Sequence, residues 1–223
     1  MKFLKNLKRQ ISFYRIKDSK DLVEYHFKNF SEHDHINKNM FLQVLKNFRN
    51  KSINILETGS SAWGTNSSIL FDNYVKKFGG SFVTVDIREE PSSNLNKVFS
   101  NNSKAFVDDS VNFIKNYDKT KLNELNLIYL DSYDLDLDNP EPSMQHGLNE
   151  FLLIDSFIDV GTVIAIDDTP ISLELFGQEV VDKYKENKDF LPGKGTYVLE
   201  HINKKNNYEV IYHHYSLVIK KTK

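Results

Sequence analysis

The segment from Ile53 to Ser68 constrains the fold of this chain more than any other. An apolar run at its start ends in Glu57 and passes into a loop that contains Gly59 and Gly64. Thr65 then offers a cap for a helix. Glycine adopts backbone dihedrals that other residues avoid and carries no Cβ, so the N–H groups of such a loop approach a ligand closely. The pattern predicts a strand, a tight loop and a helix, with a cofactor bound over the loop.

Composition limits the class of protein and excludes several kinds of site. The chain has 223 residues, of which 39% are hydrophobic and 13% aromatic, enough to fill one sizeable core. Its 29 basic and 31 acidic residues give a formal net charge of -2, so no global basic field favours nucleic acid. Cysteine is absent, which excludes disulfides, thiolate catalysis and cysteine-type zinc sites. We expect one globular unit without a nucleic-acid partner.

The sequence also lacks the patterns of membrane insertion and export. No apolar run approaches the roughly 20 residues that span a bilayer. The basic segment 1–9 is interrupted by lysines and lacks the apolar core of a signal peptide. We expect a cytoplasmic protein without a membrane span, acting alone or as a homo-oligomer.

Short apolar strands alternate with helices, and acidic residues follow the strands. The carboxyl ends of parallel strands meet at one edge of a sheet, so these acids are expected to converge there. The last two strands are separated by almost nothing, which permits only an antiparallel hairpin. The pattern predicts an α/β protein with a seven-stranded, mostly parallel sheet and a C-terminal antiparallel hairpin. Its strands are expected at 53–56, 81–86, 105–107, 125–130, 162–166, 208–215 and 217–221, with helices at 66–78, 143–157 and 173–187.

Residues 1–50 precede the first strand and carry apolar residues at helical spacing. We expect a helical extension that covers the mouth of the site as a lid, with residues 51–223 forming the main domain. His33 and His35 lie in a polar part of this extension, where either one could touch a substrate.

The glycine loop indicates which cofactor is bound. It has no lysine, as a P-loop requires, and Ser61 stands where the dinucleotide fingerprint G-x-G-x-x-G has its second glycine. The remaining pattern, E-x-G-x-x-x-x-G, resembles motif I of the class I S-adenosylmethionine (SAM)-dependent methyltransferases, E/D-x-G-x-G-x-G, with one middle glycine missing and the last displaced by one residue. The resemblance implies a Rossmann-like fold and a SAM site formed by Glu57, Gly59, Ser60, Ser61 and Gly64.

Three further residues are expected to hold the cofactor. Asp86 ends the second strand, about 20 to 30 residues after the glycine loop, where an acid can accept both ribose hydroxyls; a helix cap is the alternative. The resemblance assigns the adenine to a polar pair after the third strand, here Asp109 and Ser110, both of which would serve equally well as helix N-caps.

Asp131 follows the fourth strand, and Asp167 and Asp168 follow the fifth. Three carboxylates at adjacent strand ends repel each other unless something positive lies between them, and Mg²⁺ (or Mn²⁺) takes such oxygen ligands. The spacing resembles the metal-dependent O-methyltransferases of the catechol and macrolide-sugar type. That resemblance implies a metal that binds the acceptor hydroxyl, lowers its pKa and holds it in line with the methyl group.

Two residues compete for the role of base. Related sugar methyltransferases carry a histidine three residues after the fourth-strand acid, and this chain has Asp134 there. Asp134 is a candidate base or a further ligand, and His146 is the rival base or a residue at a helix start. The resemblance and the polar character of residues 131–146 predict a small polyhydroxylated acceptor, such as a sugar or a nucleotide-linked sugar. Lys194, between two glycines, would meet a phosphate of that acceptor or lie in solvent.

Other functions remain open at this level. Asp134, Asp136 and Asp138 form overlapping D-x-D motifs, which are typical of metal-dependent glycosyltransferases. That function does not explain the glycine loop or Asp86. A nicotinamide dehydrogenase would need an intact fingerprint, and the chain has no Tyr-x-x-x-Lys. A cofactor-binding module without catalysis is the third alternative.

Overall fold

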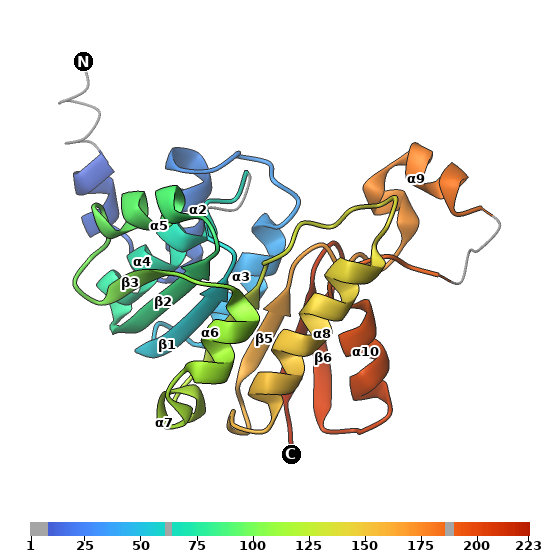
Figure 1. Ribbon diagram of the computed structural model, residues 1–223. Coiled ribbons are helices and arrows are strands. Elements are labelled where there is room, and N and C mark those ends of the chain that lie inside the picture. Colours follow the sequence, from blue (N-terminus) through green and yellow to red (C-terminus); the bar gives the residue numbers. More distant parts are fainter. Residues whose placement is uncertain (1–8, 61–63, 186–189) are drawn as a thin grey trace.

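The computed structural model describes residues 9–60, 64–185 and 190–223 (Figure 1). Its strands join into one seven-stranded sheet of order β3-β2-β1-β4-β5-β7-β6. Strands β1 to β5 pair in parallel, and β7 runs antiparallel to both β5 and β6. This confirms the predicted α/β sheet with its C-terminal hairpin. The strands are β1 (Ile53–Thr58), β2 (Gly80–Asp86), β3 (Ser103–Val107), β4 (Leu127–Leu130), β5 (Val163–Ile166), β6 (Tyr208–His213) and β7 (Leu217–Lys221).

The register of the parallel strands brings their carboxyl ends level. Thr58 pairs with Val85 on one side and with Leu130 on the other, and Leu130 pairs with Ile166. Every residue of β4 and β5 is buried, as expected for central parallel strands that are covered on both faces. The residues that follow these ends therefore share one edge of the sheet.

Helices cover both faces of the sheet (Figure 1). Buried side chains of α2, α3 and α4 form one hydrophobic cluster against the sheet, and those of α6, α8 and α10 contribute to a second cluster. The helical elements are α2 (Ser19–Asn29), α3 (Lys38–Asn47), α4 (Ser67–Phe78), α5 (Glu89–Asn96), α6 (Ser110–Asn116), α7 (Lys119–Asn123), α8 (Glu141–Asp155), the 3-10 turn η1 (Leu173–Phe176), α9 (Gln178–Lys183) and α10 (Thr196–Asn203).

The two described N-terminal helices are part of the core. Phe27 of α2 and Phe41 of α3 are buried, and the ring of Phe41 lies 5.8 Å from that of Phe71 and 5.5 Å from that of Tyr129. These two helices pack directly on the sheet, and the division at residue 50 stays a prediction. Residues 35–37, in the connection between α2 and α3, lie at the edge of the sheet where the strands end.

The structure differs from the sequence prediction in the region after β5. The helix predicted at 173–187 is broken at Gly177, whose φ of 103° places it outside helical space, so η1 and α9 replace it. Helix α10 was not predicted, because it is short and buries only Val198 and Ile202. Among the described helices, none is long and apolar enough to cross a membrane.

Candidate active site

A cavity of about 710 Å³ lies at the carboxyl ends of the parallel strands. Residues that follow all five parallel strands form its walls, together with the connection between α2 and α3. A cavity at this edge is the usual place for a ligand in an open α/β sheet. Its lining includes residues 35–37, Gly59, Ser60, 86–88, 108–110, 131–134, His146, Asp167, Asp168, Lys194 and Tyr215.

The two loop glycines are required by close packing. Gly59 has a φ of +78°, and a Cβ added there would lie 2.3 Å from the backbone oxygen of Asp131. Gly64 has a φ of +72°, and its added Cβ would lie 2.7 Å from the ring of His35. Gly59 lines the cavity, whereas Gly64 contacts the connection between α2 and α3 instead. Ser61 lies outside the described residues.

Glu57 does not line the cavity but contacts the start of α4. Its carboxylate is fully buried and accepts hydrogen bonds from the Oγ atoms of Ser67 at 2.6 Å and Ser68 at 2.5 Å. Burial, partly offset by these hydrogen bonds, raises the pKa of Glu57 to about 7. The structure thus gives Glu57 the role of joining β1 to the start of α4, which positions the loop between them.

Asp86 reaches the cavity from the end of β2. Its Oδ2 accepts from the backbone N–H of Ser60 at 2.8 Å and from the guanidinium of Arg88 at 2.7 Å. Its Oδ1 accepts from the backbone N–H of Arg88 at 2.8 Å and from Nε of the same residue at 2.9 Å. Burial raises the pKa of Asp86, but the hydrogen bonds from Arg88 and Ser60 outweigh it and hold that pKa below its ordinary value. Sequence reasoning missed Arg88, although a basic residue two positions after the acid was a visible signal.

Asp109 and Ser110 both line the cavity and differ in their contacts. Asp109 Oδ1 accepts from the backbone N–H of Asn112 at 3.0 Å, so this side chain caps α6, the alternative role considered for it. Ser110 Oγ lies 2.8 Å from Nε2 of His146 and donates to Ser132 Oγ at 3.3 Å. Ser110 is therefore part of a polar cluster on the β3 and β4 side of the cavity.

His146 belongs to that cluster and has a carboxylate one helical turn away. Its Nε2 lies 3.5 Å from Oε1 of Glu150, which is buried and also accepts from Ser132 Oγ at 2.6 Å. Burial lowers the pKa of His146, but the hydrogen bond and charge of Glu150 outweigh it and raise that pKa above its ordinary value. Asp134, the other candidate base, is exposed and also lines the cavity. Glu150 was not predicted.

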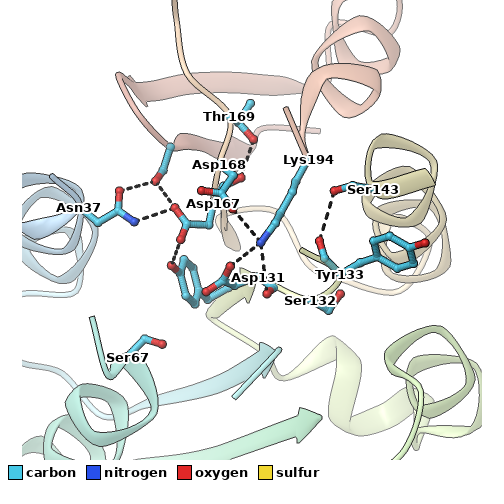
Figure 2. Close-up of polar contacts among 12 residues, drawn as sticks. Asn37, Ser67, Asp131, Ser132, Tyr133, Ser143, Asp167, Asp168, Thr169 and Lys194 are labelled. Carbon is cyan, nitrogen blue, oxygen red and sulfur yellow. Dashed lines mark hydrogen bonds and ion pairs between the residues drawn. The ribbon is translucent and has the colours of Figure 1, made fainter. Parts of the chain in front are cut away.

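Lys194 lies between two of the predicted metal ligands (Figure 2). Its Nζ is 2.7 Å from Oδ1 of Asp131 and 3.0 Å from Oδ2 of Asp168. The residue is only 4% exposed, so it does not lie in solvent, which was one of the two positions expected from the sequence. Burial lowers the pKa of Lys194, but the two carboxylates outweigh it and hold that pKa above its ordinary value. We call Asp131, Asp168 and Lys194 the lysine–acid cluster.

Asp167 points away from Lys194 and is held by neutral donors (Figure 2). Its Oδ1 accepts from Nδ2 of Asn37 at 2.7 Å and from Oγ of Ser216 at 2.7 Å. Its Oδ2 accepts from the hydroxyl of Tyr129 at 2.9 Å. Asp167 therefore ties the start of α3 and the hairpin to the end of β5.

These residues do not fit the divalent cation that the resemblance implied for Asp131, Asp167 and Asp168. Mg²⁺ needs several oxygen ligands around one open position. The position between Asp131 and Asp168 holds an ammonium group, and the oxygens of Asp167 are engaged by neutral donors. Across the described residues, no group of three or more acidic or histidine side chains is arranged to hold a metal.

The cavity does fit SAM. The cavity is large enough for such a molecule. It is lined by the acid at the end of β2, by Gly59 after β1 and by the polar residues after β3. In addition, the Oγ of Ser60 is buried and has no hydrogen-bond partner within the described part of the chain. A polar ligand in the cavity would supply that partner.

Comparisons with known proteins give the fold and no closer relationship. The sequence matches no protein-family model and no curated protein. The MycE methyltransferase from the mycinamycin biosynthetic pathway, in complex with Mg and SAH, superposes with a TM-score of 0.64 and 14% identity. That match covers 94% of this chain and 56% of MycE, so the chain spans about half the length of that protein.

Two further solved structures show the same arrangement. A putative caffeoyl-CoA O-methyltransferase from Staphylococcus aureus superposes with a TM-score of 0.54 and 16% identity, over 100% of this chain and 98% of that one. Human N-acetylserotonin methyltransferase in complex with SAM gives a TM-score of 0.50 and 13% identity, over 95% and 58%. At such identities the likeness establishes architecture alone. The chain has the Rossmann-like fold of the class I SAM-dependent methyltransferases.

Proposed function

We propose that this protein transfers the methyl group of SAM to a hydroxyl group of a small polar acceptor. One observation carries the proposal: a single cavity joins Asp86, at the end of β2, to the lysine–acid cluster, at the ends of β4 and β5. A donor held at the first position and an acceptor held at the second would meet in the same cavity. Orienting two reactants in this way is the main contribution that a protein makes to such a transfer.

The donor side is formed by residues on three strand ends. Asp86 would accept the ribose hydroxyls, and Gly59 and Ser60 would lie along the methionine part. Asp109 and Ser110 would contact the adenine. SAM supplies an electrophilic methyl group on a sulfonium, and the chain binds and orients it. Glu57 would act indirectly, by holding the loop.

The acceptor side carries several polar side chains, which favour a polar acceptor. Besides the lysine–acid cluster, the side chains of Asn37 and Tyr215 line this part of the cavity, and the hydroxyl of Tyr215 donates to Oδ1 of Asp168 at 2.9 Å. Such walls suit a molecule with several hydroxyl groups, so we propose a sugar or a nucleotide-linked sugar. Metal assistance is not part of the proposal, because the acid residues do not fit a divalent cation.

The acceptor hydroxyl must lose its proton during the transfer, and the cavity offers two groups for this step. Asp134 is exposed and borders the cavity beyond β4. His146 is paired with Glu150 but lies against Ser110, beside the proposed adenine position. A base must be within hydrogen-bonding reach of the proton that it removes, so the position of the bound acceptor decides between them.

Titration of the protein with SAM and with SAH by calorimetry tests the proposal. We expect both to bind, and Asp86→Asn to weaken SAH binding by about tenfold or more, since a hydrogen bond to a charged group contributes about 1.5 to 3 kcal/mol. Asp182→Asn, on the exposed side of α9, is the matched control and should leave the affinity unchanged.

Other outcomes would overturn the proposal. Binding of a nucleotide-sugar donor without SAM, followed by glycosyl transfer, would show that the protein is a glycosyltransferase that uses its D-x-D motifs. The geometry gives that function little support, because Asp136 and Asp138 do not line the cavity and Asp138 pairs with Lys183. Binding of SAM without turnover on any hydroxylated acceptor would indicate a cofactor-binding module.

A further inference from the structure

We infer that the ammonium group of Lys194 takes the place of the divalent cation found in metal-dependent O-methyltransferases, so that this site works without a metal. The inference rests on the proposed function for its chemical role, but the placement of Lys194 stands on the contacts alone. Lys194 is a positively charged group, nine-tenths buried, between two carboxylates at the ends of neighbouring strands. It supplies the positive charge that these acids require.

Close contacts hold the backbone around Lys194 in place. A Cβ on Gly147 of α8 would lie 2.3 Å from the backbone oxygen of Lys194. On the other side, the N–H of Lys194 donates to the backbone oxygen of Asp168 at 3.0 Å. The neighbouring glycine nitrogen, that of Gly195, donates to Oγ1 of Thr169 at 2.8 Å.

The flanking glycines explain how a lysine comes so close to the acids. A Cβ on Gly193 would lie 2.8 Å from the backbone oxygen of Asp168, and a Cβ on Gly195 would lie 2.8 Å from Oγ1 of Thr169. Any other residue at these two positions would push the segment away from β5. The two glycines of Gly-Lys-Gly therefore allow the ammonium group of Lys194 to lie against the strand ends.

Lys194 also has donor capacity directed at a ligand. An ammonium group has three hydrogens, and the two ion pairs use two of them. The third contact, to the backbone oxygen of Asp131, is long at 3.4 Å. Because Lys194 lines the cavity, this third hydrogen is the one that would be donated to an acceptor oxygen.

In the transfer, Lys194 acts as a hydrogen-bond donor and keeps its proton. The acceptor oxygen uses a lone pair to form the new O–C bond while the S–C bond of the donor breaks, and that electron pair stays on sulfur to leave SAH. The hydroxyl proton passes to the base and then to water. The ammonium hydrogen bond orients the oxygen and stabilises the negative charge that develops on it as the proton leaves.

The first test is metal binding by the wild-type protein, measured with Mn²⁺ by electron paramagnetic resonance, with and without SAH. We expect no binding at this site at millimolar Mn²⁺. The inference would be overturned if the wild type bound one Mn²⁺ per chain, if Mg²⁺ displaced it and if Asp168→Asn abolished the binding. The expected result is read on the wild-type protein and needs no acceptor.

The second test uses Lys194→Ala, which leaves Asp131 and Asp168 facing an open position. We expect this variant to bind Mn²⁺ at least roughly tenfold more tightly than the wild type, and the gain to be lost when Asp168→Asn is added. Lys183→Ala, which removes an exposed lysine paired with Asp138, is the matched control and should gain nothing. A folded Lys194→Ala protein without any gain would contradict the inference. Failure of the proposed function would appear separately, as absence of SAH binding to the wild type.

Discussion

The side chain and backbone of Arg88 occupy three of the four hydrogen-bonding positions on the carboxylate of Asp86. Each oxygen of Asp86 accepts two hydrogen bonds, and the N–H of Ser60 supplies the fourth. A carboxylate has about four such positions, so ribose hydroxyls can reach Asp86 only after the guanidinium withdraws. The Arg88 side chain is 54% exposed, so it borders solvent into which it can withdraw once its hydrogen bonds to Asp86 and to the backbone oxygen of Ser60 break.

Arg88→Ala is expected to tighten SAH binding by roughly threefold to tenfold. The guanidinium competes with the ribose for Asp86, and removing a competitor raises the fraction of protein that is ready to bind. Calorimetry with SAH measures the change, and Arg15→Ala, at an exposed position of the N-terminal segment, serves as the control. Weaker binding by Arg88→Ala would show that Arg88 contacts the cofactor.

Gly59→Ala is expected to destabilise the protein far more than Gly177→Ala. Both glycines have positive φ, so both variants incur backbone strain of about 1 to 3 kcal/mol. Only at position 59 does the added Cβ also collide with a backbone oxygen, because nothing lies within 4 Å of the one at Gly177. Urea unfolding measures the free energy of unfolding of both variants, and the difference between them is the cost of the collision. Equal losses in the two variants would mean that the backbone oxygen of Asp131 does not lie against Gly59.

His26 is expected to make the fold sensitive to mild acid. It is buried, its Nε2 lies 2.6 Å from the backbone oxygen of Thr65, and burial lowers its pKa to about 4. Between pH 6.5 and 4 the unfolded chain binds the extra proton, so stability falls as pH falls, by about 3 kcal/mol in total. Urea unfolding at several pH values measures this, and His26→Gln should reduce the slope. His33→Gln, at an exposed position, should keep the wild-type slope.

Glu57 is expected to have the opposite pH dependence. Burial raises its pKa to about 7, so the folded chain retains a proton that the unfolded chain loses above about pH 4.5. Stability from this group is complete below pH 4.5 and is lost as pH rises through 7. Glu57→Gln removes this dependence of stability on pH. The free energy of unfolding of the variant minus that of the wild type should therefore rise by up to about 3 kcal/mol between pH 5 and pH 8.5. A constant difference across that range would contradict the assignment.

Glu150 is expected to control the titration of His146. Its hydrogen bond and charge raise the pKa of His146 against the effect of burial, so Glu150→Gln should lower that pKa. Nuclear magnetic resonance titration of the imidazole measures the change directly. Glu141→Gln, in the first turn of the same helix and bonded to Tyr197, should leave it unchanged.

The fold was predictable because its signals are local. Apolar runs such as those of β4 and β5 are long enough to identify buried strands, and the short connection before Leu217 permits only a hairpin. The positions of Asp86 and Asp131 at the sheet edge follow from that pattern alone. Both residues line the cavity as expected, although their roles toward ligands stay predictions.

The partners of the acids were not predictable from local patterns. Lys194 lies 63 residues from Asp131 in the sequence, and Gly-Lys-Gly by itself indicates an exposed loop. Asn37 lies 130 residues from Asp167. Such pairs depend on how distant segments pack, and a single sequence carries no signal for them. The sequence suggested a metal between these acids for this reason, because it gave no sign that a distant lysine lies there.

The contacts of Asp167 constrain the order in which the molecule can assemble. The Oγ of Ser216 lies 2.8 Å from Oδ1 of Asn37 and 2.7 Å from Oδ1 of Asp167, and Nδ2 of Asn37 donates to the same oxygen of Asp167, although Asn37 and Ser216 are 179 residues apart. During synthesis the strands that carry Asp86 emerge early, whereas this junction cannot close until the final hairpin has left the ribosome. Long-range contacts of this kind form late and slow folding. The part of the cavity around Asp86 can therefore take shape before the part around Asp167 and Asp168 is complete.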